Sequence, residues 1–222
     1  MKRQKPTSTR FISLLVTFLF LAIASNAQKI AGKDTVKTIK IDNQVWMVEN
    51  LAVGNFRNGD PIPEAKTNEE WIQAGKEGKP AWCYYENKID SGAKYGKLYN
   101  WYAINDSRGL APRSWHVPSD SEWRMVTLFL GGEDAAGTKM KSPTGWTHDG
   151  NGTNSSGFCG LPAGSRNRFG EFDYVGHIAY WWCSTSYDSD FAWYRVIDEV
   201  PWYVYRTNYY KQNGYSVRCV HD

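Results

Sequence analysis

The sequence has little of what metal or thiol catalysis requires. Its four histidines, His116, His148, His177 and His221, lie far apart and form no HxH or HExxH spacing. Its four cysteines are scattered and form no CxxC pair. Because zinc sites and redox-active dithiols are recognised by such spacings, we predict neither a metal site nor another cofactor.

Catalytic carboxylates and nucleophiles are also hard to find. The acidic residues between 188 and 199 could supply the two acids of a glycosidase, but acidic residues in turns usually remain solvated. Oxygen atoms of Asp149, Asn151 and Asn154 could coordinate calcium, although a polar loop is the simpler interpretation. We therefore expect a protein that is not an enzyme.

Only one long apolar run is present, and it lies at the N-terminus. Residues 11–24 are apolar apart from Ser13 and Thr17, four basic residues precede them, and Ser25-Asn26-Ala27 fits a cleavage site. This pattern predicts a signal peptide over 1–27, because a spanning helix needs about 20 apolar residues. We expect an exported protein with no membrane span after cleavage, a flexible segment over 28–34 and one domain over 35–222.

Positive charge is not in excess once the signal peptide is set aside. Four of the 26 basic residues and none of the 23 acidic ones lie in 1–27, which leaves 22 against 23, a net charge of −1. A nucleic-acid-binding surface is normally basic. The composition therefore argues against a nucleic-acid partner.

The pattern of the chain predicts an α+β fold. A strand hairpin is expected around Asp42-Asn43. Capping boxes predict one helix after Thr67 and another over 120–130 after Ser119, and a short helical segment is expected over 133–141. Residues 98–104 fit either a strand or a helix.

The C-terminal third has a different sequence pattern, in which short runs of aromatic and β-branched residues are separated by turn residues. Such runs predict an antiparallel sheet. The expected strands are 158–161, 172–174, 178–183, 191–197, 202–205 and 215–220. The whole chain thus reads as a hairpin, two or three helices and an antiparallel sheet.

Several motifs keep a common order along the chain. They are Trp46-Met47-Val48-Glu49-Asn50-Leu51, Tyr95-Gly96-Lys97-Leu98-Tyr99-Asn100-Trp101-Tyr102, Trp115-His116-Val117-Pro118-Ser119-Asp120-Ser121-Glu122-Trp123, Gly157-Phe158-Cys159-Gly160-Leu161-Pro162-Ala163-Gly164, Trp181-Trp182-Cys183-Ser184-Thr185, Ala192-Trp193-Tyr194-Arg195 and Ser216-Val217-Arg218-Cys219-Val220. With them the chain after residue 34 resembles the Fibrobacter succinogenes major paralogous domain, found in secreted proteins of Bacteroidetes-like bacteria. The resemblance implies a C-type-lectin-like or sulfatase-modifying-factor-like fold, in which the first and last strands pair.

All four cysteines follow the signal peptide, so disulfides are the expected state in an oxidising compartment. Three pairings are possible. We favour Cys83 with Cys219 and Cys159 with Cys183, since the latter two replace small hydroxyl residues of the family in strands expected to be neighbours.

Aromatic residues are in excess, with 11 Trp and 14 Tyr. Some must be core, and Trp115, Trp123, Trp146 and Trp181 have apolar or glycine neighbours that indicate packing. Side chains alternate along a strand, so each aromatic pair such as Trp181-Trp182 places one ring on each side of the sheet. Either the second side is covered as well, or it displays rings to solvent.

Exposed Trp and Tyr rings are well suited to stacking on sugars or to anchoring a protein partner. Our leading hypothesis is a non-catalytic domain that binds polysaccharide or a cell-envelope partner through the aromatic face 182–213. The candidate residues are Trp182, Tyr194, Arg195, Trp202, Tyr203, Arg206, Asn208, Tyr209, Tyr210 and Asn213. The alternatives are a protein-interaction or adhesion module with a variable loop face, and an enzyme of the sulfatase-modifying-factor type.

Overall fold

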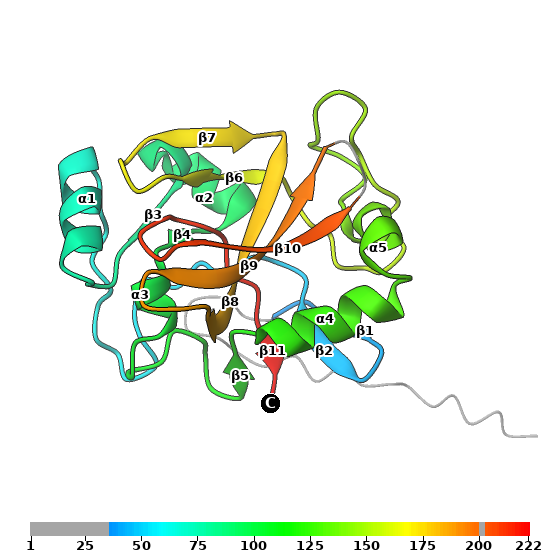
Figure 1. Cartoon of the computed structure of the whole chain (residues 1–222), viewed down its shortest axis with the longest axis horizontal. Helices are drawn as coiled ribbons and strands as arrows, with labels where there is room; N and C mark the ends of the chain where they lie inside the picture. Colours follow the sequence, from blue (N-terminus) through cyan, green and yellow to red (C-terminus); the bar gives the residue numbers. More distant parts are fainter. Residues whose placement is uncertain (1–35, 200–202) are drawn as a thin grey trace, which may run out of the picture.

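The computed structural model describes residues 36–199 and 203–222 and is of mixed α and β structure with antiparallel sheets (Figure 1). Its helices are α1 (Asn68–Lys76), α2 (Ile89–Tyr95), α3 (Trp101–Ile104), α4 (Asp120–Phe129) and α5 (Glu133–Met140), with a 3-10 turn at Tyr85–Asn87. Its strands are β1 (Thr38–Ile41), β2 (Gln44–Met47), β3 (Trp82–Cys83), β4 (Leu98–Tyr99), β5 (Trp115–His116), β6 (Ala163–Arg166), β7 (Phe172–Val175), β8 (Ile178–Ser186), β9 (Phe191–Asp198), β10 (Val204–Tyr210) and β11 (Val220–His221). The predicted signal peptide and the segment 28–34 lie outside the described residues.

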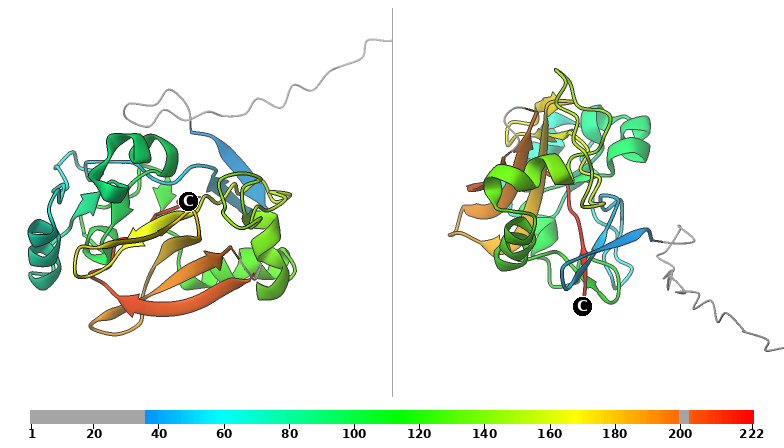
Figure 2. Two further views of the ribbon diagram at one scale, coloured as in Figure 1. Left: turned by 90° about the horizontal axis from the view of Figure 1, so that it is seen from above. Right: turned by 90° about the vertical axis from the view of Figure 1, so that its right-hand side faces the viewer.

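The two ends of the described chain meet in one sheet, with the strand order β1-β2-β11-β5. The hairpin turns at Asp42, which adopts a φ of 54°, as predicted for a two-residue turn. Val220 of β11 lies opposite Trp46 of β2. The last strand therefore pairs with the first hairpin through its second strand, and Figure 2 shows these segments together.

The longest strands form a second sheet in the order β10-β9-β8, with β10 at its edge. A core cluster lies on each side of this sheet. Trp181 joins Trp46 and Trp123 in one cluster, whereas the neighbouring Trp182 joins Tyr194 and other residues in a second. The aromatic pair thus has both of its rings in the interior, and in this part of the sheet the covered arrangement is the one observed.

Two helices begin as predicted. Thr67 and Glu70 form a capping box at α1, and Ser119 and Glu122 form one at α4. In both boxes the hydroxyl of the cap residue accepts a hydrogen bond from the backbone N–H of the glutamate. The glutamate carboxylate in turn accepts one from the backbone N–H of the cap residue, so two donors at the helix start are satisfied.

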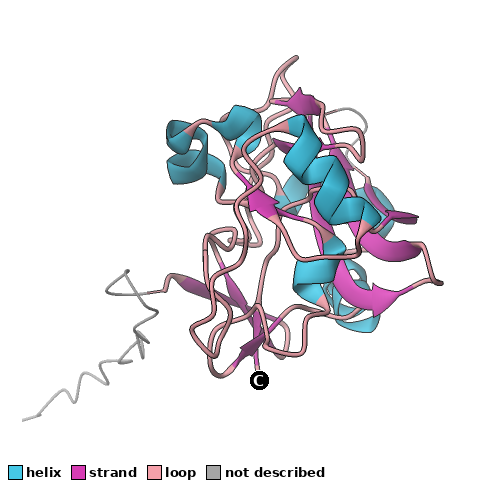
Figure 3. Ribbon diagram, turned by 90° about the vertical axis from the view of Figure 1, so that its left-hand side faces the viewer, coloured by secondary structure: helices cyan, strands magenta, loops and turns pink. Residues whose placement is uncertain are grey.

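The prediction of two or three helices is wrong, because five α-helices occur in the part of the chain that the structure describes. Residues 98–104 hold both a strand and a helix: β4 ends at Tyr99, and Asn100 caps the four-residue α3. Such short helices carry no periodic pattern from which they could be read. Three of the six expected strands differ from the structure. Residues 158–161 are loop with one bridge at Gly160, and 215–220 have bridges at Tyr215 and Ser216 and become strand only at Val220, in β11. The expected strand 202–205 is observed as β10, which begins at Val204 and continues to Tyr210. Figure 3 shows how much of the chain is loop.

The predicted disulfides are not formed, since all four cysteines are free. Cys83 lies in a small cluster with Trp71, Cys219 in the cluster around Trp182, and Cys183 in the cluster around Trp181. The thiols are thus distributed among separate parts of the core. None of the helices among the described residues is long and apolar enough to cross a membrane.

Candidate functional site

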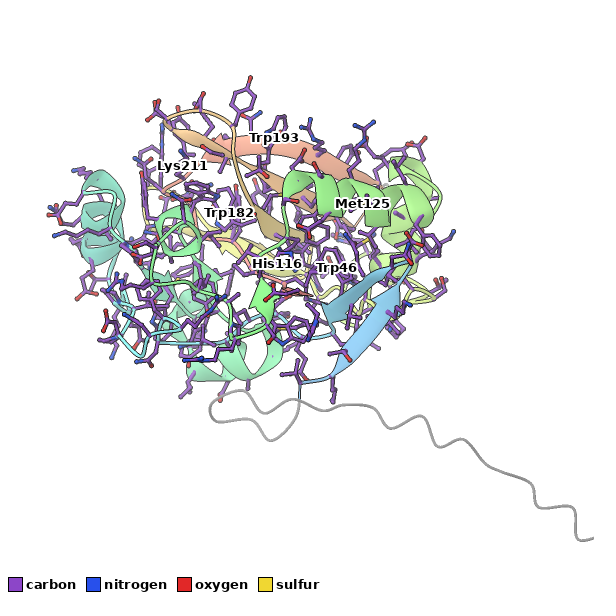
Figure 4. All side chains as sticks on the ribbon, turned by 90° about the horizontal axis from the view of Figure 1, so that it is seen from below. Trp46, His116, Met125, Trp182, Trp193 and Lys211 are labelled. Atoms are coloured by element: carbon purple, nitrogen blue, oxygen red, sulfur yellow. The ribbon has the colours of Figure 1, made fainter. Side chains whose placement is uncertain are left out.

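The predicted aromatic face is divided by the sheet into interior and surface residues. Trp182, Tyr194, Arg195 and Asn213 are buried, with exposures of 0%, 9%, 2% and 4%. Trp182 donates through Nε1 to the carbonyl of Tyr99 at 2.9 Å, and Asn213 donates to the hydroxyl of Tyr215 at 3.0 Å. The prediction that these four residues bind a ligand at the surface is therefore wrong, because they belong to the core. Figure 4 shows Trp182 toward the middle of the molecule and Trp193 near its periphery.

Arg195 is buried because it has an acidic partner. Its Nη1 lies 2.8 Å from Oδ1 of Asp120, and its Nη2 donates to the Asp120 carbonyl at 3.0 Å. Asp120 is the first residue of α4. The pair therefore attaches the start of that helix to the middle strand of the sheet.

The remaining candidates lie on or near the edge strand β10. Tyr203, Asn208 and Tyr210 are half-buried, Arg206 and Tyr209 are exposed, and Trp202 lies outside the described residues. Because side chains alternate along a strand, these residues do not share one surface. Arg206, Asn208 and Tyr210 face one side of the sheet, and Tyr203 and Tyr209 face the other.

On the first side, other side chains of the protein already cover the aromatic rings. The guanidinium of Arg206 lies 3.5 Å from the ring centre of Trp193 and also binds both carboxylate oxygens of Asp120. Tyr210 packs on Phe191 at 4.5 Å and lies under the guanidinium of Arg168 at 3.9 Å. Trp193 and Tyr210 thus have covered faces, which leaves little flat surface for a ligand.

On the second side lie three tyrosines, Tyr203, Tyr205 and Tyr209, which we call the tyrosine row. Tyr205 is 39% and Tyr209 45% exposed. Tyr203 meets Tyr205 edge to face at 5.6 Å. Tyr205 and Tyr209 are four residues apart in one strand, a separation of about 13 Å, and the half-buried Thr207 lies between them. Sequence reasoning missed Tyr205, although its alternation with Tyr203 and Tyr209 would have selected it.

Two of the three loop residues considered for calcium, Asn151 and Asn154, use their side-chain oxygens to bind backbone. Asn151 Oδ1 accepts from the N–H of Trp146 at 3.1 Å, and Asn154 Oδ1 accepts from the N–H of Cys159 at 2.7 Å. These bonds close the loop on itself and support the interpretation of a structural polar loop.

One group of potential metal ligands was missed by sequence reasoning. His148, His177 and Glu199 place one ligand atom each within 4.8 Å of one another. They come from the 142–156 loop, the β7–β8 turn and the residue after β9, which are too far apart in the chain for any spacing rule to detect.

The thiol of Cys183 does not have the surroundings of a catalytic cysteine. It is fully buried, and burial raises its pKa to about 12. A reactive cysteine needs an accessible thiolate, so Cys183 serves the core.

Comparison with known families agrees with the motifs. Residues 39–221 match the model of the Fibrobacter succinogenes major domain, so the chain belongs to this family. No curated protein and no solved structure matches the chain.

Proposed function

We propose that this chain is an exported, non-catalytic binding domain that recognises polysaccharide through the tyrosine row, which begins just before β10 and continues along it. The observation that carries the proposal is that Tyr205 and Tyr209 project from the same side of an edge strand and are both substantially exposed. Figure 2 shows β10 along an outer side of the molecule, opposite the β1–β2 hairpin.

The chemistry of the row suits a sugar chain. A tyrosine ring offers a flat apolar face for the C–H groups of a pyranose, and its hydroxyl remains free to bond to sugar hydroxyls or water. A separation of about 13 Å is longer than one sugar ring, so the row favours a polymer over a monosaccharide. The pairing of β10 with β9 along its whole length fixes the backbone from which Tyr205 and Tyr209 project, which limits the entropy lost on binding.

The proposed fold is C-type-lectin-like or sulfatase-modifying-factor-like. The pairing of the last strand with the first hairpin supports it. Sugar binding through a calcium ion is not part of the proposal, because the chain lacks the Glu-Pro-Asn or Gln-Pro-Asp and Trp-Asn-Asp motifs that hold that ion in C-type lectins.

A protein partner is the second candidate, and a separate observation favours it. Helix α4 exposes Met125, Leu128 and Phe129, with exposures of 51%, 61% and 59%. These residues are three and four apart and so share one helix face. An adhesion or interaction module would use such an apolar face as an anchor.

The test is a binding screen of the purified protein against soluble and insoluble polysaccharides, with and without EDTA. The proposal expects binding that survives EDTA and is lost in Tyr205→Ala and Tyr209→Ala. Tyr187→Ala is the matched control, since Tyr187 is 54% exposed but lies in the β8–β9 turn outside the row. Binding to a protein partner that depends on Leu128 and Phe129 would favour the second candidate.

A further inference from the structure

We propose that His148, His177 and Glu199 form a binding site for one zinc ion. The proposal is independent of the tyrosine row. It rests on the way three distant segments bring two imidazole nitrogens to the two oxygens of one carboxylate. Figure 1 shows the 142–156 loop near the end of β9, where these segments come together.

The distances are close to those of a metal site. His177 Nδ1 lies 2.8 Å from Glu199 Oε2, and His148 Nδ1 lies 3.1 Å from Glu199 Oε1. With Zn–N and Zn–O bonds of about 2.0–2.2 Å, tetrahedral ligand atoms lie about 3.3 Å apart. Small rotations of the side chains are therefore enough to admit the ion between them. Each imidazole would then carry its proton on Nε2 and present an unprotonated Nδ1.

The backbone holds the two histidines in place before any ligand arrives. The N–H of Thr147 donates to the carbonyl of Gly176 at 2.9 Å, which joins the residue before His148 to the residue before His177. His148 adopts a φ of 47°, in the left-handed region that a non-glycine residue seldom enters. Such strained conformations cluster at ligand sites.

Glu199 is held equally well. The fully buried Lys141 donates from Nζ to the Glu199 carbonyl at 2.7 Å. The hydroxyl of Thr147 bonds to the Glu199 carboxylate, and without an ion it also lies 2.9 Å from Nδ1 of His177, a contact that zinc on Nδ1 would replace. Thr147 therefore acts as an outer group that orients the Glu199 carboxylate, as outer groups do around bound metals.

The donor set and exposure define the class of metal. Two imidazoles and one carboxylate suit zinc and similar borderline divalent ions better than calcium or magnesium, which prefer oxygen. The side chains of His148 and His177 are 72% and 39% exposed. The fourth position of a tetrahedral ion would therefore face solvent and take a water molecule or an external ligand. The ion would tie the loop, the β7–β8 turn and the end of β9 together.

The test is isothermal titration of zinc chloride into the tag-free, chelator-treated protein. One equivalent of zinc is expected, with a higher melting temperature when zinc is bound. His148→Ala, His177→Ala and Glu199→Gln should each weaken binding by more than the roughly 10- to 100-fold typical of removing an outer group. Thr147→Val should fall within that outer-group range.

His116→Ala is the matched control, because His116 also bonds to two carboxylates, those of Glu122 and Asp222, but belongs to no group of three potential metal ligands among the described residues. It should leave zinc binding unchanged. The exposed His148 can be replaced with little risk to the fold, which keeps the test valid if another variant fails to fold. Cobalt in place of zinc should give the visible absorption of a tetrahedral site. Zinc binding that is absent, or equal in the wild-type protein and the His148→Ala/His177→Ala double variant, would overturn the proposal.

Discussion

The carboxylate of Asp120 lies 2.8 Å from Nη1 of Arg195, a side chain of which only 2% is exposed. The same carboxylate binds Arg206 of the edge strand through both of its oxygens. One acidic residue at the start of α4 therefore connects the helix to both β9 and β10. The orientation of the edge strand β10 therefore depends on the pair of Asp120 with the buried Arg195.

Replacing Asp120 should destabilise the protein strongly. In Asp120→Asn the buried Arg195 keeps its charge but loses its counter-charge, and an unpaired buried charge costs about 3–5 kcal/mol. Asp120 is partly exposed, so we expect a loss of at least about 2 kcal/mol in the free energy of unfolding measured with urea. Asp134→Asn, at an exposed position in α5, should change it little. Equal stabilities of the two variants would contradict the structure.

His116 should make stability depend on pH near neutrality. Burial lowers its pKa, but bonds to Asp222 and Glu122 outweigh this effect, and the net shift is upward from 6.5. A group whose pKa is raised by folding contributes its full stability below the unfolded pKa and loses it as pH rises through the folded pKa. The difference in unfolding free energy between wild type and His116→Gln should therefore be largest below about pH 6.5 and shrink at higher pH. A difference that grows with pH would show that the imidazolium is not stabilised by these carboxylates.

Trp182 and Tyr209 should differ sharply when each is replaced by alanine. Trp182 is fully buried and donates to a backbone carbonyl, so its removal should cost about 3–5 kcal/mol. Tyr209 is 45% exposed, and its removal should stay within about 0.5 kcal/mol. Thermal and urea unfolding measure both. Similar losses for the two variants would place Tyr209 in the core and remove it from the tyrosine row.

The cysteines should react in a fixed order with a thiol reagent. Burial raises the pKa of Cys83, Cys183 and Cys219 to about 12, whereas Cys159 is half-buried. Since the thiolate is the reactive form, the native protein should be modified at Cys159 first and at the other three only after denaturation. Peptide mapping after alkylation identifies the sites. Denatured, unreduced protein in which no thiol reacts would instead support the disulfides predicted from the sequence.

Features set by neighbouring residues could be predicted from the sequence. The two capping boxes depend on side chains that contact backbone within three residues, and the turn depends on Asp42 adopting a positive φ, so local patterns were sufficient. Trp115, Trp123, Trp146 and Trp181 are buried as expected. The family was also recognisable from its motifs.

Features set by distant residues could not be predicted. Alternation indicated that Trp181 and Trp182 face opposite sides of a sheet, but not that a core cluster covers each side. The cluster of His148, His177 and Glu199 forms because a loop, a turn and a strand end meet in space. The spacing of these residues along the sequence does not indicate that they are in contact.

The most direct test of the central claim is the affinity of the wild-type protein and of Tyr205→Ala, Tyr209→Ala and Tyr187→Ala for a polysaccharide found in the binding screen. The account predicts that the first two variants bind much more weakly, while Tyr187→Ala binds like wild type and all four proteins unfold at similar temperatures. Unchanged affinity in both row variants, with the fold intact, would contradict the claim that the tyrosine row binds polysaccharide.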